Sequence, residues 1–369
     1  MLLCVSMLAV LLTGCSGGKG TAATGNARIL IATCAKGDAF RDMLIAALES
    51  ACDEQGIGHD TVYAEQSAEQ QVAQVKEAKS QGYTAVICRL IDVDTALQVE
   101  RAADGLPVIF VNNCPDEGYL KADEYIYVAS NESVAGSYQA QYVLDKLSGK
   151  SEINVMILQG EKTHSATKGR TEAAKRVLNE SGKKINYLFQ DYADWSPELG
   201  QEYFEIFNST GRTVDCVISN NDSMAVGAIA GMEACGIDPA TIVVCGVDAT
   251  ADACRLVKEG KMDFTVCQNA VNQANAAVDV AVLGQGHESD QIGRRTGVYQ
   301  RRIANMKVFC QLLLKFYGVT AGSQPEFQGT VYQIDHLLMI IDSGSVWDPV
   351  ALLVWFLLVE AVAVFRHQV

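Results

Sequence analysis

Positive charge and catalytic motifs are both scarce in this chain. Of 369 residues, only 29 are Lys or Arg against 44 Asp or Glu, and the formal charge is -15 at pH 7. Because nucleic acids and anionic membranes are bound by clustered Lys and Arg, this balance argues against a nucleic-acid or membrane-surface partner. The five histidines have no metal-ligand spacing, and neither HExxH nor GxSxG occurs. We therefore expect no enzymatic activity and no cofactor.

Other chemical motifs are absent or incomplete. The twelve cysteines form no CxxC, and several of them (Cys88, Cys216, Cys245 and Cys267) lie in apolar runs, where a thiol behaves as a small hydrophobic group. "GQGHESDQIG" has Ser289 where a dinucleotide fingerprint needs its third glycine, and "GEKTHS" lacks the upstream glycines of a phosphate loop. Neither a disulfide framework, a zinc site nor a nucleotide site is expected.

What the chain does have is apolar sequence in a regular alternation. Hydrophobic residues make up 49% and charged residues 20% of the chain, so a sizeable core is expected. From Arg28, β-branched runs alternate with amphipathic stretches such as the one with Met43, Leu44, Ala47, Leu48 and Ala51 on one face. The runs are "RILIAT", "TAVICRL", "PVIFVN", "INVMIL", "VDCVIS" and "TIVVCGV". Continuous apolar strands separated by helices predict parallel sheets covered on both faces.

The pattern restarts at "INVMIL", after a helix-like stretch that ends in a Gly/Ser/Lys turn. This predicts an α/β protein of two doubly wound parallel-sheet lobes joined by a hinge. We place the N-terminal lobe at 28–129 together with about 269–283, and the C-terminal lobe at 130–268. The rhythm stops beyond Leu283, so 284–369 is treated as an atypical tail.

The first residues, "MLLCVSMLAVLLTGCSGGKG", resemble a bacterial lipoprotein signal. A short apolar core ends in small residues directly before Cys15. The resemblance implies a signal peptide over 1–14, lipid attachment at Cys15 and a flexible tether over 15–27. An ordinary secretory signal or a short anchor is the alternative. Either interpretation places the body of the protein outside the cytoplasmic membrane.

The tail contains the apolar stretch "VWDPVALLVWFLLVEAVAVF" at 346–365. Asp348, Pro349 and Glu360 interrupt it, which makes a spanning helix costly. A membrane span, a shifted reading frame and an unrelated fused segment all remain open.

Polar residues that directly follow the apolar runs are the candidates for a binding site, because ligands of doubly wound sheets bind beyond the carboxyl ends of the strands. The candidates are Asp38, Phe40, Asn112, Asn113, His164, Arg170, Trp195, Asn220 to Asp222, Asp248, Gln268 and Asn269. Carboxylates, amides and guanidinium groups pair with adjacent hydroxyls, and aromatic faces cover a sugar ring. The set therefore favours a polyhydroxylated ligand.

Several candidates have a purely structural alternative. Asp38 is either a helix N-cap or a ligand contact, and Phe40 is either core or contact. Trp195 directly precedes Ser196-Pro197, a cap and first-turn pair, but the partner of a hydrophobic staple would be Gly200, which has no side chain. A stacking role is therefore favoured for Trp195. Thr250 is expected to cap the helix after Asp248 and leave that aspartate free.

Together these stretches resemble one family, the type I periplasmic sugar-binding proteins, and within it the glucose/galactose-binding branch. The similarity covers about 27–283 and rests on "KGDAF", "FVNNCP", "GEKTHSATKGR", "DYADW", "ISNNDSMAVGA", "CGVDAT" and "TVCQNAVNQA". It implies ligand contacts from Asp38, Phe40, Asn112, His164, Arg170, Trp195, Asn221 and Asp248. Gln268 stands where the hexose binders have an asparagine, and is added as a contact. Either Asn220 or Asp222 would then cap the helix that follows Asn221.

Two departures from that branch bear on the ligand. Ala166 stands where the glucose/galactose binders carry a second carboxylate, so the identity of the sugar is open. The calcium loop of some relatives has no counterpart, because "LDKLSGKSEINVMIL" passes directly from helix to strand, and no metal site is expected. Hinge crossovers are expected near Ser130 and Asn269, with a third near 297–301.

The resemblance implies a lipid-anchored, monomeric substrate-binding protein that captures a monosaccharide between its lobes and delivers it to an ABC permease. A sensory receptor domain that detects a sugar or a sugar-like signal is the alternative, and the apolar tail is what supports it. A transcriptional repressor of the same fold is disfavoured, since no helix-turn-helix precedes Arg28.

Overall fold

The computed structural model describes residues 27–283. The predictions for the signal peptide, Cys15, the tether up to residue 26, the third crossover and the segment 346–365 lie outside the described residues.

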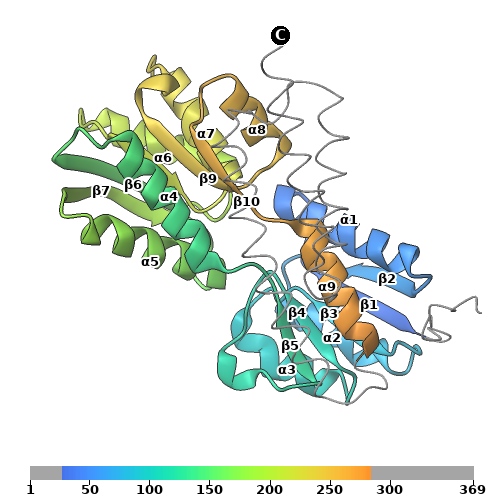
Figure 1. The fold of residues 1–369 in the computed structure, drawn as a ribbon. Helices are drawn as coiled ribbons and strands as arrows, with labels where there is room; N and C mark the ends of the chain where they lie inside the picture. Colours follow the sequence, from blue (N-terminus) through green and yellow to red (C-terminus); the bar gives the residue numbers. More distant parts are fainter. Residues whose placement is uncertain (1–26, 284–369) are drawn as a thin grey trace, which may run out of the picture. The chain divides into compact units, whose positions relative to one another are not determined.

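The first sheet has five parallel strands in the order β2-β1-β3-β4-β5. These are β1 (Arg28–Thr33), β2 (Gly58–Tyr63), β3 (Ala85–Cys88), β4 (Val108–Val111) and β5 (Tyr125–Val128). One face is covered by α1 (Ala39–Glu54) and α9 (Ala270–Leu283), and the other by α2 (Ala68–Ala78) and α3 (Ala96–Ala102) (Figure 1). Two 3-10 turns, Val93–Thr95 and Glu117–Tyr119, lie in its loops.

The position of a strand in this sheet determines whether its sequence has the apolar pattern by which a buried strand can be predicted. The inner strands β3 and β4 are buried at every residue, because helices cover both of their faces. The edge strands β2 ("GHDTVY") and β5 are only partly buried. They carry polar or aromatic residues instead of an apolar run, and for that reason the sequence pattern did not identify them.

Helix α9 belongs to the first sheet although it lies at the far end of the described chain. Its residues Ala274 and Ala277 share one core with Leu44 and Leu48 of α1. In α1 the buried face includes Ile45, whereas Met43, which we expected on that face, is 38% exposed. The chain therefore crosses between the two sheets twice within the described residues, after β5 and after β10.

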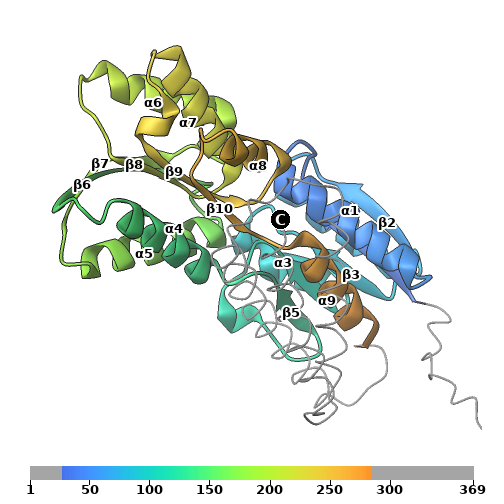
Figure 2. The same ribbon diagram turned by 45° about the horizontal axis from the view of Figure 1, so that its top comes forward.

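The second sheet is also parallel, with strand order β10-β9-β8-β6-β7. Its strands are β6 (Glu152–Gln159), β7 (Lys184–Tyr192), β8 (Cys216–Ser219), β9 (Val243–Asp248) and β10 (Phe264–Cys267). Figure 2 shows α6 (Pro197–Ser209), α7 (Asp222–Ala234) and α8 (Ala251–Lys258) on one face, and α4 (Glu132–Lys146) and α5 (Ser165–Glu180) on the other. A 3-10 turn, Pro239–Thr241, precedes β9.

Glycines bring the helices of the second lobe into unusually close contact. A Cβ on Gly136 of α4 would lie 2.0 Å from the backbone oxygen of Arg170, and one on Gly169 of α5 would lie 2.9 Å from Cβ of Glu132. Real Cβ contacts are longer than this, so both positions need glycine for α4 and α5 to pack as they do. The close packing places Glu132 beside Arg170.

Cys34, Cys52, Cys88, Cys216 and Cys245 are buried free thiols. Burial raises the pKa of Cys52 to about 11 and that of Cys88 to about 12. Within 27–283 no group of His, Cys, Asp and Glu residues is arranged to hold a metal ion. No helix in that range is long and apolar enough to cross a membrane.

Candidate ligand-binding site

A cavity lies where the carboxyl ends of strands from both sheets meet. It is lined by Asp38, Phe40, Arg89, Asn112, His164, Ala166, Arg170, Trp195, Asn221 and Asp248. Eight of the nine residues that the sequence suggested as ligand contacts are thus brought together, and the ninth, Gln268, contacts Arg170 behind the cavity wall.

Asp38 and Asn221 line the cavity and are also helix caps. The Oδ1 atom of Asp38 accepts a hydrogen bond from the backbone of Arg41 at 2.7 Å, and Oδ1 of Asn221 accepts one from Met224 at 3.0 Å. Each cap occupies one side-chain atom and leaves the second carboxylate oxygen or the amide nitrogen for a ligand. Capping and ligand contact are therefore compatible at both positions.

The capping assignment in "ISNNDS" needs correction, because Asn221 itself caps α7. Asn221 is the last residue with an extended backbone before the helix, whereas Asp222 is already helical. Asn220 is used elsewhere, since its Oδ1 atom accepts from the backbone of Gly160 and from the hydroxyl of Thr171, both at 3.2 Å. Asn220 therefore connects the end of β8 to the end of β6 and to α5.

Asp222 is a buried support for the loop that carries Asp248. Its two oxygens accept hydrogen bonds from the backbone of Thr250 at 2.8 Å and from the hydroxyl of Thr265 at 2.6 Å. Thr250 caps α8 as expected and leaves Asp248 in the cavity wall. Burial raises the pKa of Asp222 to about 6 and that of Asp248 well above its usual value.

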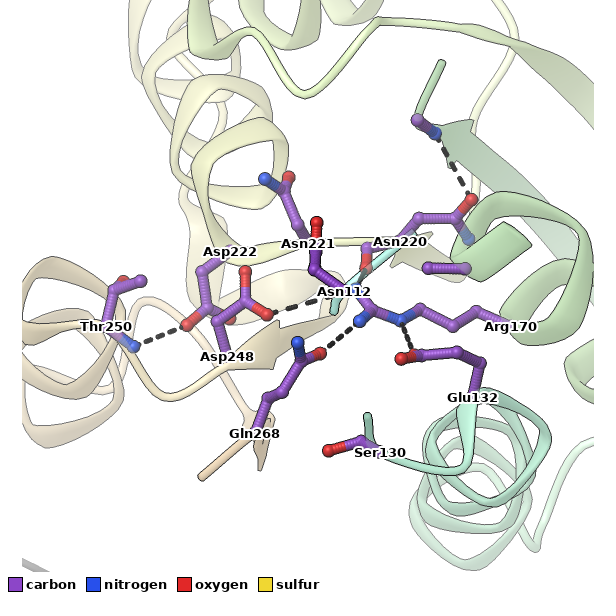
Figure 3. A network of polar contacts seen from close by, with 12 residues as sticks. Asn112, Ser130, Glu132, Arg170, Asn220, Asn221, Asp222, Asp248, Thr250 and Gln268 are labelled. Carbon is purple, nitrogen blue, oxygen red and sulfur yellow. Dashed lines mark hydrogen bonds and ion pairs between the residues drawn. The ribbon is translucent and has the colours of Figure 1, made fainter. Parts of the chain in front are cut away.

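Arg170 lines the cavity and is the centre of the polar network in Figure 3. The side chain is 3% exposed, and Nε donates to the Glu132 carboxylate at 2.5 Å. Nη1 donates to the backbone oxygen of Asn220 at 2.6 Å and lies 3.9 Å from Oδ1 of Asp248, while Nη2 donates to Oε1 of Gln268. Two carboxylates balance this buried cation, and its bonds hold its planar group in one orientation.

His164 is held neutral and in one tautomer. It caps α5, with Nδ1 accepting a hydrogen bond from the backbone of Ala166 at 3.2 Å. The ring proton is then on Nε2, which lies 3.3 Å from Oδ1 of Asn112. Burial, reinforced by the nearby Arg89 and Arg170, lowers the pKa of His164 well below its usual value.

The indole of Trp195 packs directly on backbone. A Cβ on Gly160 would lie 2.1 Å from two atoms of the six-membered ring, so only glycine allows the ring to lie there. The edge contact with His164, at a centroid distance of 5.0 Å, fixes the ring from a second side. Trp195 is partly exposed and lines the cavity, which leaves ring surface for a ligand.

Sequence reasoning missed Arg89 and the role of Gly160. Arg89 comes immediately after the last residue of β3, where our rule for strand ends selects residues. We interpreted it as part of the apolar run "TAVICRL", and an arginine inside such a run was the available signal. Gly160 left no signal, because its role depends on the position of a ring that is 35 residues further along the chain.

Comparison with known proteins agrees with this geometry. Residues 29–286 match the family model described as periplasmic binding protein domain. The chain belongs to this family. Its members bind solutes and are not enzymes, and the two parallel sheets confirm the predicted type I fold.

Individual relatives of this periplasmic binding protein have different ligands in their names. A "Putative rhizopine-binding protein" of Rhizobium meliloti is 30% identical over 70% of this chain and 78% of its own length. The D-galactose/methyl-galactoside binding periplasmic protein of Haemophilus influenzae is 28% identical over 59% of this chain and 69% of its own. A Bacillus halodurans ABC transporter solute binding protein with bound myo-inositol is 30% identical, with a TM-score of 0.65 over 73% of this chain and 92% of that one. Membership of the glucose/galactose branch therefore stays a prediction.

Proposed function

We propose that this protein captures a monosaccharide, or a cyclic polyol of the same size, and delivers it to an ABC importer. The observation that carries the proposal is the cavity, which combines hydrogen-bonding groups from both sheets with two aromatic side chains. The names of the relatives, which include a galactose binder and a structure with bound myo-inositol, support the same class of ligand.

The arrangement suits adjacent ring hydroxyls. Asp38 and Asp248 provide carboxylate acceptors, and Asn112, Asn221 and Arg170 provide donors. A hydroxyl both donates and accepts, so each pair of neighbouring hydroxyls finds complementary groups. Trp195 and Phe40 cover the apolar C–H face of the ring. No nucleophile with an adjacent base is needed, since the ligand is released unchanged.

We further propose that the lobes move as two bodies, 28–129 with 269–283 and 130–268, about crossovers near Ser130 and Asn269. The crossovers are joined by a hydrogen bond from Nε2 of Gln273 to the hydroxyl of Ser130 at 2.9 Å. Ser165 of the second lobe contacts the first, accepting from the backbone of Cys114 at 2.9 Å and donating to Oδ1 of Asn113 at 3.2 Å. These contacts join the lobes in the structure, and opening of the lobes to admit a ligand would break them.

The family places the protein outside the cytoplasm. Attachment to the membrane through a lipid on Cys15 and a monomeric state are part of the proposal. Metabolic labelling with a radioactive fatty acid tests the anchor: label should appear on the wild type and be lost in Cys15→Ser. Label on neither protein would refute it.

Calorimetric titration against D-glucose, D-galactose, D-ribose and myo-inositol tests the function. At least one should bind with a dissociation constant well below millimolar, and absence of binding at millimolar concentration for all four would refute the proposal. Ala166→Asp tests the finer question, because it adds the carboxylate found in the glucose/galactose binders. This variant should bind glucose or galactose more tightly than the wild type does.

A further inference from the structure

Arg89 is a second buried arginine in the cavity wall. It is 3% exposed and follows β3, in the lobe opposite Arg170. Nε donates to Oδ1 of Asn112 at 3.3 Å, and Nη1 donates to the backbone oxygen of Leu90 at 3.1 Å. Nη2 approaches the Glu161 carboxylate only to 3.8 Å, which is beyond hydrogen-bond distance.

The two arginines of the cavity are balanced differently. Arg170 has a carboxylate at 2.5 Å and a second at 3.9 Å. Among the described residues, the one carboxylate in an ion pair with Arg89 is that of Glu161, which is partly exposed and comes from the other lobe. A guanidinium has five N–H donors, and a buried charge is costly unless hydrogen bonds satisfy it. Arg89 therefore has donor capacity that an oxygen atom in the cavity would satisfy.

The neighbours of Arg89 make this corner of the cavity rich in donors. Oδ1 of Asn112 faces two donors, Nε of Arg89 and Nε2 of His164, both at 3.3 Å. His164 carries its ring proton on Nε2, because its Nδ1 accepts a hydrogen bond from the backbone N–H of Ala166. With its oxygen taken, Asn112 presents its NH₂ group to a ligand. Arg89 and Asn112 thus both offer donors to a ligand in the cavity.

We infer that Arg89 determines specificity by donating a hydrogen bond to a ligand oxygen. The site then binds a ring with a hydroxyl or carbonyl oxygen at this corner and discriminates against the same ring with an ammonium group there. This inference rests on the proposed function and deepens it, since it names which substituent the site discriminates. An ammonium would place donors and a positive charge against the guanidinium of Arg89 and the NH₂ group of Asn112, which are themselves donors.

The test is calorimetric titration of the parent ligand that binds best and of its monoamino derivatives, with the amine at one ring position at a time. The wild type should bind at least one derivative about tenfold or more weakly than the parent. Arg89→Gln should weaken binding of the parent by about tenfold and reduce the discrimination against that amine to within about threefold. Arg89→Lys keeps the charge without the planar fork, so it should keep the discrimination while it weakens binding of the parent.

Matched controls separate this role from a structural one. Arg101→Gln removes an exposed arginine from the same lobe and should change neither affinity nor discrimination. Glu161→Gln should also keep the discrimination, and if it reproduces Arg89→Gln, Arg89 acts through that ion pair and the inference is overturned. Unchanged discrimination in Arg89→Gln overturns it as well. If no polyol binds the wild type, the proposed function fails first and the inference falls with it.

Discussion

The contact between the indole of Trp195 and the backbone of Gly160 predicts how a substitution at Gly160 should change ligand affinity. In Gly160→Ala the new Cβ would lie 2.1 Å from Cζ2 and Cη2 of the indole. Carbon atoms in contact are about 3.5–4.0 Å apart, so the ring must move by more than about 1 Å. Trp195 is partly exposed and can swing toward solvent, which should keep the loss of folding stability near 1 kcal/mol, the low end for overpacked sites.

Ligand affinity should respond much more strongly. If the ring stacks on the ligand, its displacement should weaken binding about tenfold, equivalent to about 1.4 kcal/mol. Trp195→Ala should weaken binding by at least as much, because the whole stacking surface is removed. The assay is calorimetric titration with the ligand that binds the wild type best, together with thermal unfolding of each variant.

Gly149→Ala is the matched control, because a Cβ there meets no atom within 4 Å. It should leave both the affinity and the unfolding temperature unchanged. Wild-type affinity in a folded Gly160→Ala variant would refute the reasoning about the ring position. Wild-type affinity in Trp195→Ala would show that the indole does not contact the ligand at all.

Three further predictions concern the supports of the site. Asn221→Ser keeps the helix cap and removes the amide, so it should weaken ligand binding at least about tenfold at nearly unchanged stability. Asn221→Ala removes the cap as well and should also lower the free energy of unfolding in urea by about 1 kcal/mol. Equal stability of the two variants would contradict the capping role of Asn221. Gly136→Ala should lower the free energy of unfolding by roughly 1–3 kcal/mol and weaken ligand binding, because α4 and α5 must separate where Glu132 holds Arg170. An unchanged urea midpoint of unfolding would contradict that packing. Burial raises the pKa of Asp222 to about 6 in the folded state, above the ordinary aspartate value of 3.8 that applies to the unfolded chain. The folded protein then holds more protons than the unfolded chain between these values, so its unfolding free energy should fall as pH rises from about 4 to about 6, and Asp222→Asn should flatten that decline in urea titrations.

The sequence was most informative where a residue's role depends on its neighbours along the chain. Inner strands such as β3 and β4 are apolar throughout because both of their faces are covered, and the caps Ser196 and Thr250 directly precede their helices. The rule that ligands bind beyond strand carboxyl ends selected eight of the residues that line the cavity. Which of them contact a ligand is still a prediction.

Other features depend on contacts between distant parts of the chain. The sequence alone does not show that Asn221 both caps α7 and lines the cavity, nor that Gly160 gives room to a ring 35 positions away. Gln268, 98 residues from Arg170 in sequence, reaches its guanidinium because β10 ends beside that group. The two arginines of the cavity look alike in sequence, and only the tertiary structure distinguishes them, because it places Glu132 against Arg170 and leaves Arg89 without a hydrogen-bonded carboxylate. Local pattern thus determined the elements and the edge where ligands bind, while packing decided which polar atoms remain available there.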